Sequence, residues 1–385
     1  TAVMAMQAGD TDYAEERALR AIELDPEWTK AKLLYARTML IAGRQDEAIE
    51  YTARLIGDDP DPDPDARMEL ALMMMTAGKD DDALSQINHI LLEQPSRADA
   101  LRMMAIINFR LENLDAAWAD FQDLLASGRF TMDALYYLAR IADFREEHER
   151  AARLYAQVRS GPNAVVSQRR ASALIAYELE DPQKALQDLE EFGNNSPSHA
   201  IDMVLARAQL LASLERYDEA LDFYDRYVMY RPDDESALLS RAELLLRMDR
   251  LDEAVEQYRA AAKRWPESAM SLNALGYTLA DRTDEYKEAE KLIRKALEYD
   301  PDSPAIIDSL GWVLFKRGEY EAALVELERA YEKLDDHEVA AHIVEVLVAL
   351  ERRDDALEVL EDAESRHTDS ELLQDVRDRL FPDAD

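Results

Sequence analysis

An alanine that recurs every 33 to 35 residues most constrains the fold of this chain. The eleven alanines are Ala14, Ala48, Ala83, Ala117, Ala151, Ala185, Ala220, Ala254, Ala289, Ala323 and Ala356. A second small residue lies twelve or thirteen positions before each alanine after the first, except that Val344 precedes the last, and a proline lies twelve positions after seven of them. Small side chains let two helices approach closely, alanine favours the helix, and proline ends it. The pattern therefore predicts repeated pairs of antiparallel helices.

The period of about 34 residues with this small, small, proline pattern resembles the tetratricopeptide repeat (TPR) family. The resemblance implies an all-α, right-handed superhelical solenoid of antiparallel helix pairs. We expect one continuous solenoid domain over residues 1–385: a partial first repeat at 1–28, ten repeats at 29–369, and a capping helix and tail at 370–385. Because the chain starts inside a first helix and without an initiator Met, we expect it to be a fragment of a longer protein.

The composition excludes several classes of function. The chain has 82 acidic and 45 basic residues, a formal net charge of −37, and no cysteine. Nucleic acid and anionic membrane surfaces would be repelled, so we expect neither as a partner. A disulfide framework, a thiolate metal site and a cysteine nucleophile are excluded. No apolar run approaches the length of a membrane span, so we expect no direct membrane insertion by this segment.

Motifs for catalysis and for metal binding are missing from the sequence. The six histidines include no i, i+4 pair, and the chain has no glycine-rich phosphate loop and no GxSxG elbow. The aspartates of residues 58–66 suggest a calcium loop, but Ala66 and Leu72 stand where an EF-hand loop starting at Asp61 needs Gly and Glu. We predict no catalytic residue, no metal site and no cofactor, and we do not expect an enzyme.

Two irregular connections are expected along the array. Residues 160–166 predict a slightly longer link between repeats, and residues 281–286 add one residue to a turn between the two helices of a repeat. Both are candidate hinges or changes of pitch.

The first helix of each repeat predicts a binding groove, since the family's geometry places these helices on the concave surface. In the first half of the array the inward positions carry nearly balanced charges with interleaved aromatic residues. Arginine and aromatic residues dominate binding hot spots. The predicted protein-binding residues there are Arg102, Phe109, Arg110, Tyr136, Arg140, Phe144, Arg170 and Tyr177. The alternative is that some of these aromatics only pack between neighbouring repeats.

The second half of the array is more acidic on its inward positions. The predicted binding residues there are Asn273, Tyr277, Asp308, Trp312 and Phe315. The different character of the two halves leads to the hypothesis that two grooves engage two partners.

Three segments, 272–283, 301–314 and 338–347, have a more specific sequence than the general repeat pattern requires. Together they resemble the C-terminal repeats of proteobacterial outer-membrane TPR lipoproteins, although Val344 and Val348 stand where that family usually has Gly and Trp. The resemblance implies an adaptor that binds a periplasmic carboxyl-terminal processing protease and its substrates, including cell-wall hydrolases. It also implies a periplasmic location with an N-terminal lipid anchor upstream of this chain. The alternative is a TPR scaffold for envelope assembly or polysaccharide export without a protease.

Overall fold

The computed structural model describes residues 2–57 and 63–382, and every regular element in these ranges is a helix. The chain divides into two compact units, residues 1–203 and 204–385, each described here by itself. The helices of unit 1 are α1 (Ala2–Gln7), α2 (Thr11–Leu24), α3 (Thr29–Ile41), α4 (Gln45–Gly57), α5 (Pro64–Thr76), α6 (Asp80–Glu93), α7 (Ala98–Arg110), α8 (Leu114–Ala126), α9 (Thr131–Phe144), α10 (His148–Ala156), α11 (Ala164–Ala173), a π-helix (Leu174–Glu178), α12 (Pro182–Asn195) and a short 3-10 helix (Pro197–His199). Helix α13 (Ala200–Ser213) crosses from one unit into the other.

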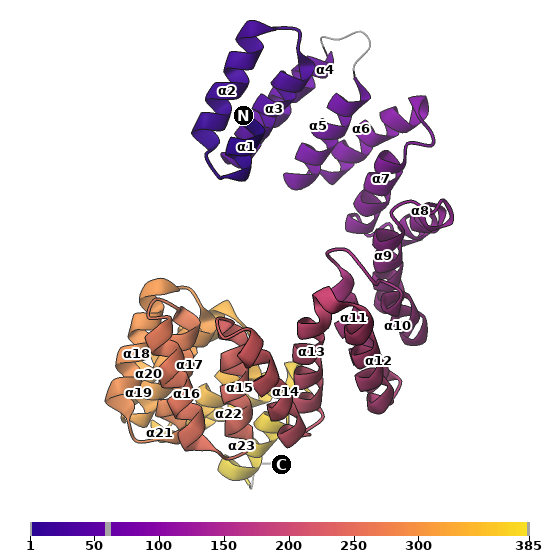
Figure 1. Ribbon diagram of the computed structural model, residues 1–385. Coiled ribbons are helices and arrows are strands. Elements are labelled where there is room, and N and C mark those ends of the chain that lie inside the picture. The colour runs from indigo at the N-terminus through magenta and orange to yellow at the C-terminus, as the bar shows by residue number, and fades with distance from the viewer. Residues whose placement is uncertain (1, 58–62, 383–385) are drawn as a thin grey trace. The chain divides into compact units, whose positions relative to one another are not determined.

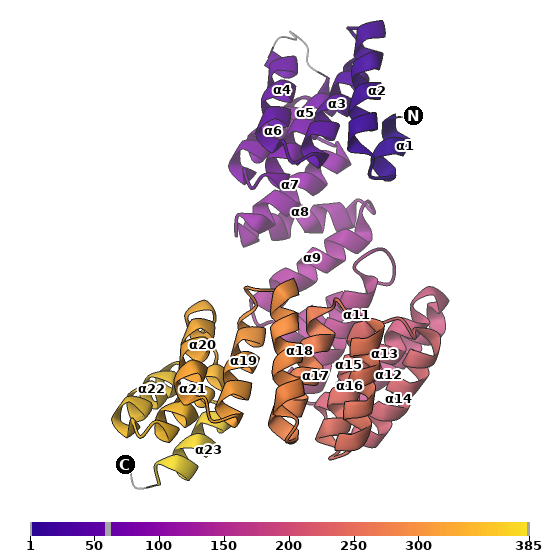
Figure 2. The ribbon, with the colours of Figure 1, turned by 90° about the vertical axis from the view of Figure 1, so that its left-hand side faces the viewer.

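Unit 2 continues the same alternation of helices. Its helices are α14 (Tyr217–Tyr230), α15 (Glu235–Arg247), α16 (Leu251–Arg264), α17 (Ala269–Arg282), α18 (Tyr286–Tyr299), α19 (Pro304–Lys316), α20 (Tyr320–Lys333), α21 (His337–Ala349), α22 (Arg353–Arg366) and α23 (Glu371–Leu380). Within each unit, successive helices form hairpins (Figure 1), and the first helices of adjacent repeats also touch, as α3 touches α5 and α17 touches α19. Figure 2 shows α15 to α18 standing side by side.

The recurring alanines form the centre of each helix pair. All eleven are fully buried, with no exposed surface. The helices that precede the described prolines end two residues before them, as α14 ends at Tyr230 before Pro232 and α18 ends at Tyr299 before Pro301. Pro60, the remaining proline of the series, lies outside the described residues. The prediction of an all-α solenoid of antiparallel helix pairs is confirmed.

Two glycines, Gly276 on α17 and Gly311 on α19, replace the first-helix alanine in two repeats of unit 2. A Cβ atom on Gly311 would lie 2.5 Å from Cγ of Leu327 and 3.2 Å from the carbonyl oxygen of Ala323. A Cβ atom on Gly276 would lie 2.6 Å from Cγ1 of Ile293. These contacts are shorter than van der Waals distance, so the packing of α17 on α18 and of α19 on α20 requires glycine.

In the described repeats other than that of α17 and α18, the turn between the two helices has one residue in the left-handed backbone region. Glycine fills this place in some repeats, as at Gly43 and Gly318. In six other repeats an acidic residue fills it, with φ between 52° and 62°: Glu112, Glu146, Glu180, Glu215, Asp249 and Glu351. Left-handed conformations are costly for residues with a Cβ atom, so these turns carry strain that the packed helices on either side maintain.

The repeat formed by α11, the π-helix and α12 departs from the pattern. The N–H of Leu179 donates to the carbonyl oxygen of Leu174 at 3.0 Å, which is an i→i−5 bond. A π-turn inserts one residue into the helix and rotates the side chains that follow it. Ala173, the residue before the π-helix, is only partly buried, although its counterparts at Ala139 and Ala208 are fully buried.

The longer link between repeats is confirmed, because seven residues separate Ala156, the end of α10, from Ala164, the start of α11, whereas four separate α14 from α15. The prediction of an extra residue in the turn at 281–286 is wrong, because three residues, 283–285, separate α17 from α18, as three separate α19 from α20. The additional residue lengthens α17 instead. At the C-terminal end, α23 packs on α21 and α22 through Leu373 and Val376, which are fully buried. The assignment of the whole chain to a single solenoid domain stays a prediction.

Candidate protein-binding site

A concave pocket of about 540 Å³ lies on unit 1 between α7, α9, α10 and α11. We call it the α9 pocket, and its lining residues are Phe109, Arg110, Glu112, Leu114, Arg140, Asp143, Phe144, Tyr155 and Arg170. Five of the eight residues predicted for the first half of the array are therefore brought together here. Arg102, Tyr136 and Tyr177 do not line the pocket.

The aromatic residues of this region divide into packed and open ones. Phe109 is half-buried and meets Tyr137 edge-on, with ring centroids 5.3 Å apart. Tyr136 meets the buried Tyr155 edge-on at 6.4 Å, and burial raises the pKa of the Tyr155 phenol. Phe144, in contrast, is 72 % exposed. Phe109 and Tyr136 thus pack between neighbouring repeats, while Phe144 presents a free apolar surface.

Ion pairs to the adjacent repeat neutralise three of the predicted arginines. Arg102 donates to Asp133 at 2.5 Å, and Arg110 donates to Asp80 at 3.0 Å. Arg170 donates through two nitrogens to Asp143, at 2.7 and 2.8 Å. These pairs connect one repeat to the next and hold their guanidinium groups in fixed positions, which makes the three arginines less available to a ligand.

Arg140 differs from the other predicted arginines. Its side chain is exposed, and its guanidinium group lies over the ring of Phe109 at 4.6 Å and near that of Tyr136 at 5.8 Å. Among the residues that the structure describes, no carboxylate lies within ion-pair distance of it. The two rings orient the guanidinium group without neutralising its charge, so Arg140 offers an oriented cation at the pocket.

The remaining predicted residues of unit 1 flank the pocket. Arg102 lies on α7 with Phe130 stacked against it at 5.2 Å. Tyr177 lies on the π-helix and is 47 % exposed. The lining residues that were not predicted as binding residues are Glu112, Leu114, Asp143 and Tyr155. Tyr155 lies on the second helix of its repeat, whereas the predicted binding residues were taken from first helices.

The five predicted residues of unit 2 lie on α17 and α19, and several of them take part in a polar network that joins these helices to α21. Asp308 contacts Nδ1 of His342 at 2.8 Å, and Trp312 stacks on the His342 ring with centroids 4.1 Å apart. The Trp312 indole N–H donates to Asp281 at 3.2 Å. Asp308 and Trp312 are each only 6 % exposed.

Tyr277 extends this network from α17 to α21. Its hydroxyl donates to Glu338 at 2.9 Å, although 61 residues separate the two in the chain. Phe315 stacks on Trp312 with centroids 5.1 Å apart, and the side-chain oxygen of Asn273 is buried without a hydrogen-bond partner in the structure. The inward side chains of these repeats therefore bind one another, and their role in recognising a partner stays a prediction.

His342 belongs to this network but was not predicted from the sequence as a site residue. It is buried, and burial lowers the pKa of its imidazole, but the hydrogen bond and the charge of Asp308 outweigh burial and raise it above the ordinary value of 6.5. The available signal was its spacing, because His342 follows Asp308 by 34 residues, about one repeat.

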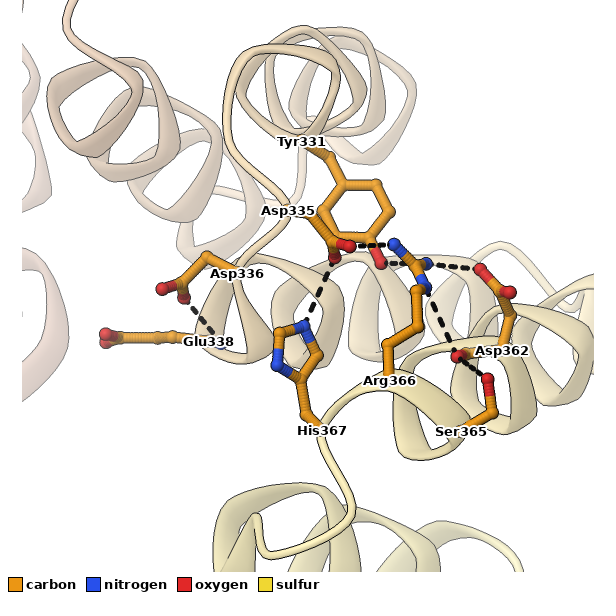
Figure 3. A network of polar contacts seen from close by, with 8 residues as sticks. All are labelled: Tyr331, Asp335, Asp336, Glu338, Asp362, Ser365, Arg366 and His367. Atoms are coloured by element: carbon orange, nitrogen blue, oxygen red, sulfur yellow. Dashed lines mark hydrogen bonds and ion pairs between the residues drawn. The ribbon is translucent and has the colours of Figure 1, made fainter. Parts of the chain in front are cut away.

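A second polar network of unit 2 connects α20, α21 and α22 near their ends (Figure 3). Arg366 contacts Asp335 and Asp362 and donates to the Tyr331 hydroxyl at 2.6 Å. His367 contacts Asp335 at 3.2 Å. Burial raises the pKa of the Asp335 carboxyl, but the hydrogen bonds from His367, Tyr331 and Arg366 prevail and lower it. The network fastens the connection between α20 and α21 to the end of α22.

The part of the chain that the structure describes has neither a cluster of metal ligands nor a helix suited to span a membrane. Within residues 2–57 and 63–382, no three His, Cys, Asp or Glu side chains are grouped so that they could hold a metal ion. In the same described ranges, no helix has the length and apolar character needed to cross a membrane.

Comparison with known proteins gives relatives of the same repeat type. The tetratricopeptide repeat family model matches residues 2–63, 170–237 and 239–304, just over half of the chain. A model described as anaphase-promoting complex, cyclosome, subunit 3 matches residues 282–363. A TPR repeat-containing protein of Pseudomonas aeruginosa is 30 % identical over 215 residues, which are 56 % of this chain and 36 % of that protein. The chain thus covers about a third of that relative's length.

Two solved structures have a similar fold. Yeast Tom70 covers 94 % of this chain and 90 % of its own, with a TM-score of 0.50 and 15 % identity. A tetratricopeptide repeat protein of Parabacteroides merdae covers 64 % of this chain and 96 % of its own, with the same TM-score and identity. Repeats of this type are typically non-catalytic scaffolds for protein interaction, and no catalytic family is indicated. The repeat pattern, the helix pairs and the family match together place this chain in the tetratricopeptide repeat family.

Proposed function

We propose that this chain is a non-catalytic scaffold of the bacterial cell envelope that binds a carboxyl-terminal processing protease and presents protein substrates to it, with cell-wall hydrolases among those substrates. The observation that carries the binding role is the α9 pocket, where the exposed Arg140 and Phe144 lie beside each other in the lining. An exposed cation and an exposed aromatic ring are the groups that most often anchor a protein partner. Support for the protease and its substrates comes from the resemblance of residues 272–349 to the adaptor lipoproteins.

The mechanism would be an increase of effective concentration. A scaffold that holds the protease on one surface and the substrate on another turns cleavage into a quasi-intramolecular step. The α9 pocket of unit 1 would hold one of these proteins, and a surface of unit 2 would hold the other. The chain's own residues would contribute binding and orientation, and the chemistry would remain with the protease.

The proposed location is the periplasm, at the outer membrane, with anchoring through a lipid on a segment upstream of Thr1. The resemblance supports this location, and the absence of cysteine from the chain is compatible with it.

The first prediction concerns Arg140. Arg140→Glu reverses the unpaired charge and is expected to weaken capture of the partner by about tenfold or more, because a hydrogen-bonded charge contact is lost and a repulsive one replaces it. The variant Arg129→Glu makes the same charge change at an exposed position outside the pocket and should bind as the native chain does. Circular dichroism should show equal helicity for both.

The measurement is affinity capture from an envelope lysate with the native chain and both variants as bait, followed by identification of the retained proteins. Recovery of a processing protease and of its substrates with the native chain, reduced with Arg140→Glu alone, would support the proposal. Recovery of an envelope-assembly or polysaccharide-export complex without a protease would favour the alternative function. Equal recovery with all three baits would reject the α9 pocket as the binding site.

A further inference from the structure

A second pocket of unit 1, separate from the α9 pocket, lies on α1, α2, α3, α5 and the start of α7. Its volume is about 670 Å³, within the range of ligand pockets in proteins. We call it the N-terminal pocket. Its lining residues are Ala2, Val3, Arg17, Ala21, Trp28, Lys30, Ala31, Leu33, Leu34, Arg37, Asp65, Met68, Glu69, Arg97 and Asp99. None of them belongs to the α9 pocket.

The lining of the N-terminal pocket has a large apolar part. Leu33 is buried, and Leu34 and Met68 are partly exposed toward the pocket they line. Trp28 precedes α3 and keeps half of its surface exposed. Methionine and tryptophan are side chains that bind large apolar groups well, the first because it adapts and the second because of its area. The pocket can therefore accept at least one large apolar side chain.

Most charged groups of the lining are already paired with one another. Arg37 binds Glu69 through two nitrogens, with Nε donating at 2.8 Å. Arg97 donates to Asp65 at 2.6 Å and to Asp99 at 2.9 Å. The Arg37–Glu69 and Arg97–Asp65 pairs connect successive repeats, in the same way as those of the α9 pocket. Together the three pairs leave little charge for a ligand.

Two cations of the lining remain poorly compensated. Lys30 is exposed, and no carboxylate of the described residues lies within ion-pair distance of it. Arg17 has its Nε buried without a hydrogen-bond acceptor, and the closest carboxylate contact of its guanidinium group is Glu16 at 3.7 Å. A buried donor without an acceptor costs free energy, which a ligand acceptor would recover.

The balance of charge in this lining is opposite to that of the chain. Four of its residues are basic and three are acidic, whereas the whole chain has 45 basic and 82 acidic residues. This excess of basic over acidic residues can attract an anion only at short range, because the net negative charge of the whole chain repels an anion at long range. Selectivity for an acidic ligand would therefore arise from direct contact with Lys30 and Arg17.

We propose that the N-terminal pocket binds an extended acidic segment of a partner protein in which Asp or Glu side chains stand on both sides of a large apolar residue. The apolar side chain lies against Trp28, Leu34 and Met68. The two flanking carboxylates pair with Lys30 and with the guanidinium group of Arg17, which come from different helices and so match two separate acidic side chains. This site is independent of the α9 pocket and of the identity of the partner proposed for it.

The test uses a labelled peptide with both ends blocked, Gly-Ser-Asp-Leu-Phe-Glu-Ser-Gly, titrated with the full chain and followed by fluorescence anisotropy. A second peptide has Asn and Gln in place of Asp and Glu. A third, Gly-Ser-Asn-Leu-Phe with a free carboxyl end, separates side-chain carboxylates from a terminal one. We expect the blocked acidic peptide to bind more tightly than the neutral one by about fivefold or more, as two partly exposed charge pairs allow.

Matched variants locate the binding site. Lys30→Glu is expected to weaken binding of the acidic peptide by about fivefold or more, whereas Lys32→Glu, on the same helix but outside the lining, should leave it unchanged. Trp28→Ala should weaken the acidic and the neutral peptide by equal factors, because it removes apolar contact only.

Several outcomes would overturn the proposal. Equal binding of the acidic and neutral peptides, or equal effects of Lys30→Glu and Lys32→Glu, would exclude charge recognition at this pocket. Preference for the free carboxyl end would assign the site to a chain terminus. Binding lost in Arg140→Glu but kept in Lys30→Glu would move the peptide to the α9 pocket and leave the proposed function intact. Self-association of the chain, measured by sedimentation and broken by Lys30→Glu, would assign the pocket to a second copy.

Discussion

At the scale of single residues, the structure gives separate tasks to side chains that look alike in the sequence. Arg102, Arg110 and Arg170 each pair with a carboxylate of another helix, while Arg140 lies over aromatic rings. The sequence pattern placed these residues on inward positions, and five of the eight do line one pocket. It could not indicate which arginines are neutralised, because the partner of each depends on side-chain directions across two repeats.

The acidic residues in left-handed turns allow a test of backbone strain. Glu146 has φ of 58°, a region that asparagine tolerates better than alanine. We expect Glu146→Asn to be more stable than Glu146→Ala by about 1 kcal/mol, since both variants remove the same charge and differ mainly in backbone preference. The free energy of unfolding in urea measures this difference.

The control for this prediction is a helical position. Glu191 is exposed on α12, where alanine is the better helix former, so Glu191→Ala should be more stable than Glu191→Asn. The same order at both positions would show that the left-handed turn imposes no special demand on residue 146.

The buried Asp308–His342 pair predicts a pH dependence of stability. The pKa of His342 is raised in the folded chain, so the protonated pair stabilises the fold fully below the ordinary pKa of 6.5. This contribution is lost as the pH rises through the raised pKa of the folded state. The variant His342→Gln does not titrate at this position, and we expect its stability to change less over that range than that of the native chain.

Urea unfolding of both proteins at pH values on either side of 6.5 provides the measurement. The difference between the two curves isolates His342 from the other five histidines. A difference in unfolding free energy between the two proteins that stays constant with pH would contradict a raised pKa of His342. A difference that grows in favour of the native chain as the pH rises would contradict it as well.

At the scale of helices and repeats, the contacts between small residues set how closely two helices pack. The sequence predicted these contacts well, because the alanine recurs in every repeat, the proline recurs in most of them, and both act locally. It did not predict the π-helix Leu174–Glu178, where the small residue is Ala as in other repeats and the change lies in the hydrogen bonding. Nor did it predict the bond from Tyr277 to Glu338, which joins residues nearly two repeats apart.

Gly311 provides the prediction at this scale. Gly311→Ala would place a methyl group 2.5 Å from Leu327 Cγ and 3.2 Å from a backbone oxygen that cannot move aside freely. We expect it to destabilise the chain by about 1 to 3 kcal/mol, despite the better helix propensity of alanine. Thermal and urea unfolding followed by circular dichroism measure the effect.

Gly57 is the matched control, since a Cβ atom there would meet no atom of the described residues within 4 Å. Gly57→Ala should be neutral or slightly stabilising. A Gly311→Ala variant as stable as the native chain would mean that α19 and α20 can separate without cost.

At the scale of the whole molecule, the excess of acidic residues dominates the electrostatics. The net charge of −37 is spread over a chain whose inner arginines are largely paired, so the uncompensated carboxylates repel one another. Added salt screens this repulsion, with a Debye length of about 10 Å at 0.1 M. The repulsion is a property of composition and could be predicted from the sequence alone.

We therefore expect the melting temperature to rise as sodium chloride is added at neutral pH. The loss of surface ion pairs acts in the opposite direction but is small for each pair. Scanning calorimetry over a series of salt concentrations is the measurement, and a fall in melting temperature would show that the ion pairs outweigh the repulsion.

The ion pairs between neighbouring repeats also restrict how the chain can evolve. Arg102 finds its carboxylate 31 residues later, whereas Arg170 finds its own 27 residues earlier. A repeat that was duplicated or moved by recombination would carry its arginine to a neighbour whose acidic residue stands at a different place. Although most repeats share one backbone plan, the order of the repeats is thus part of the information that this protein must inherit intact.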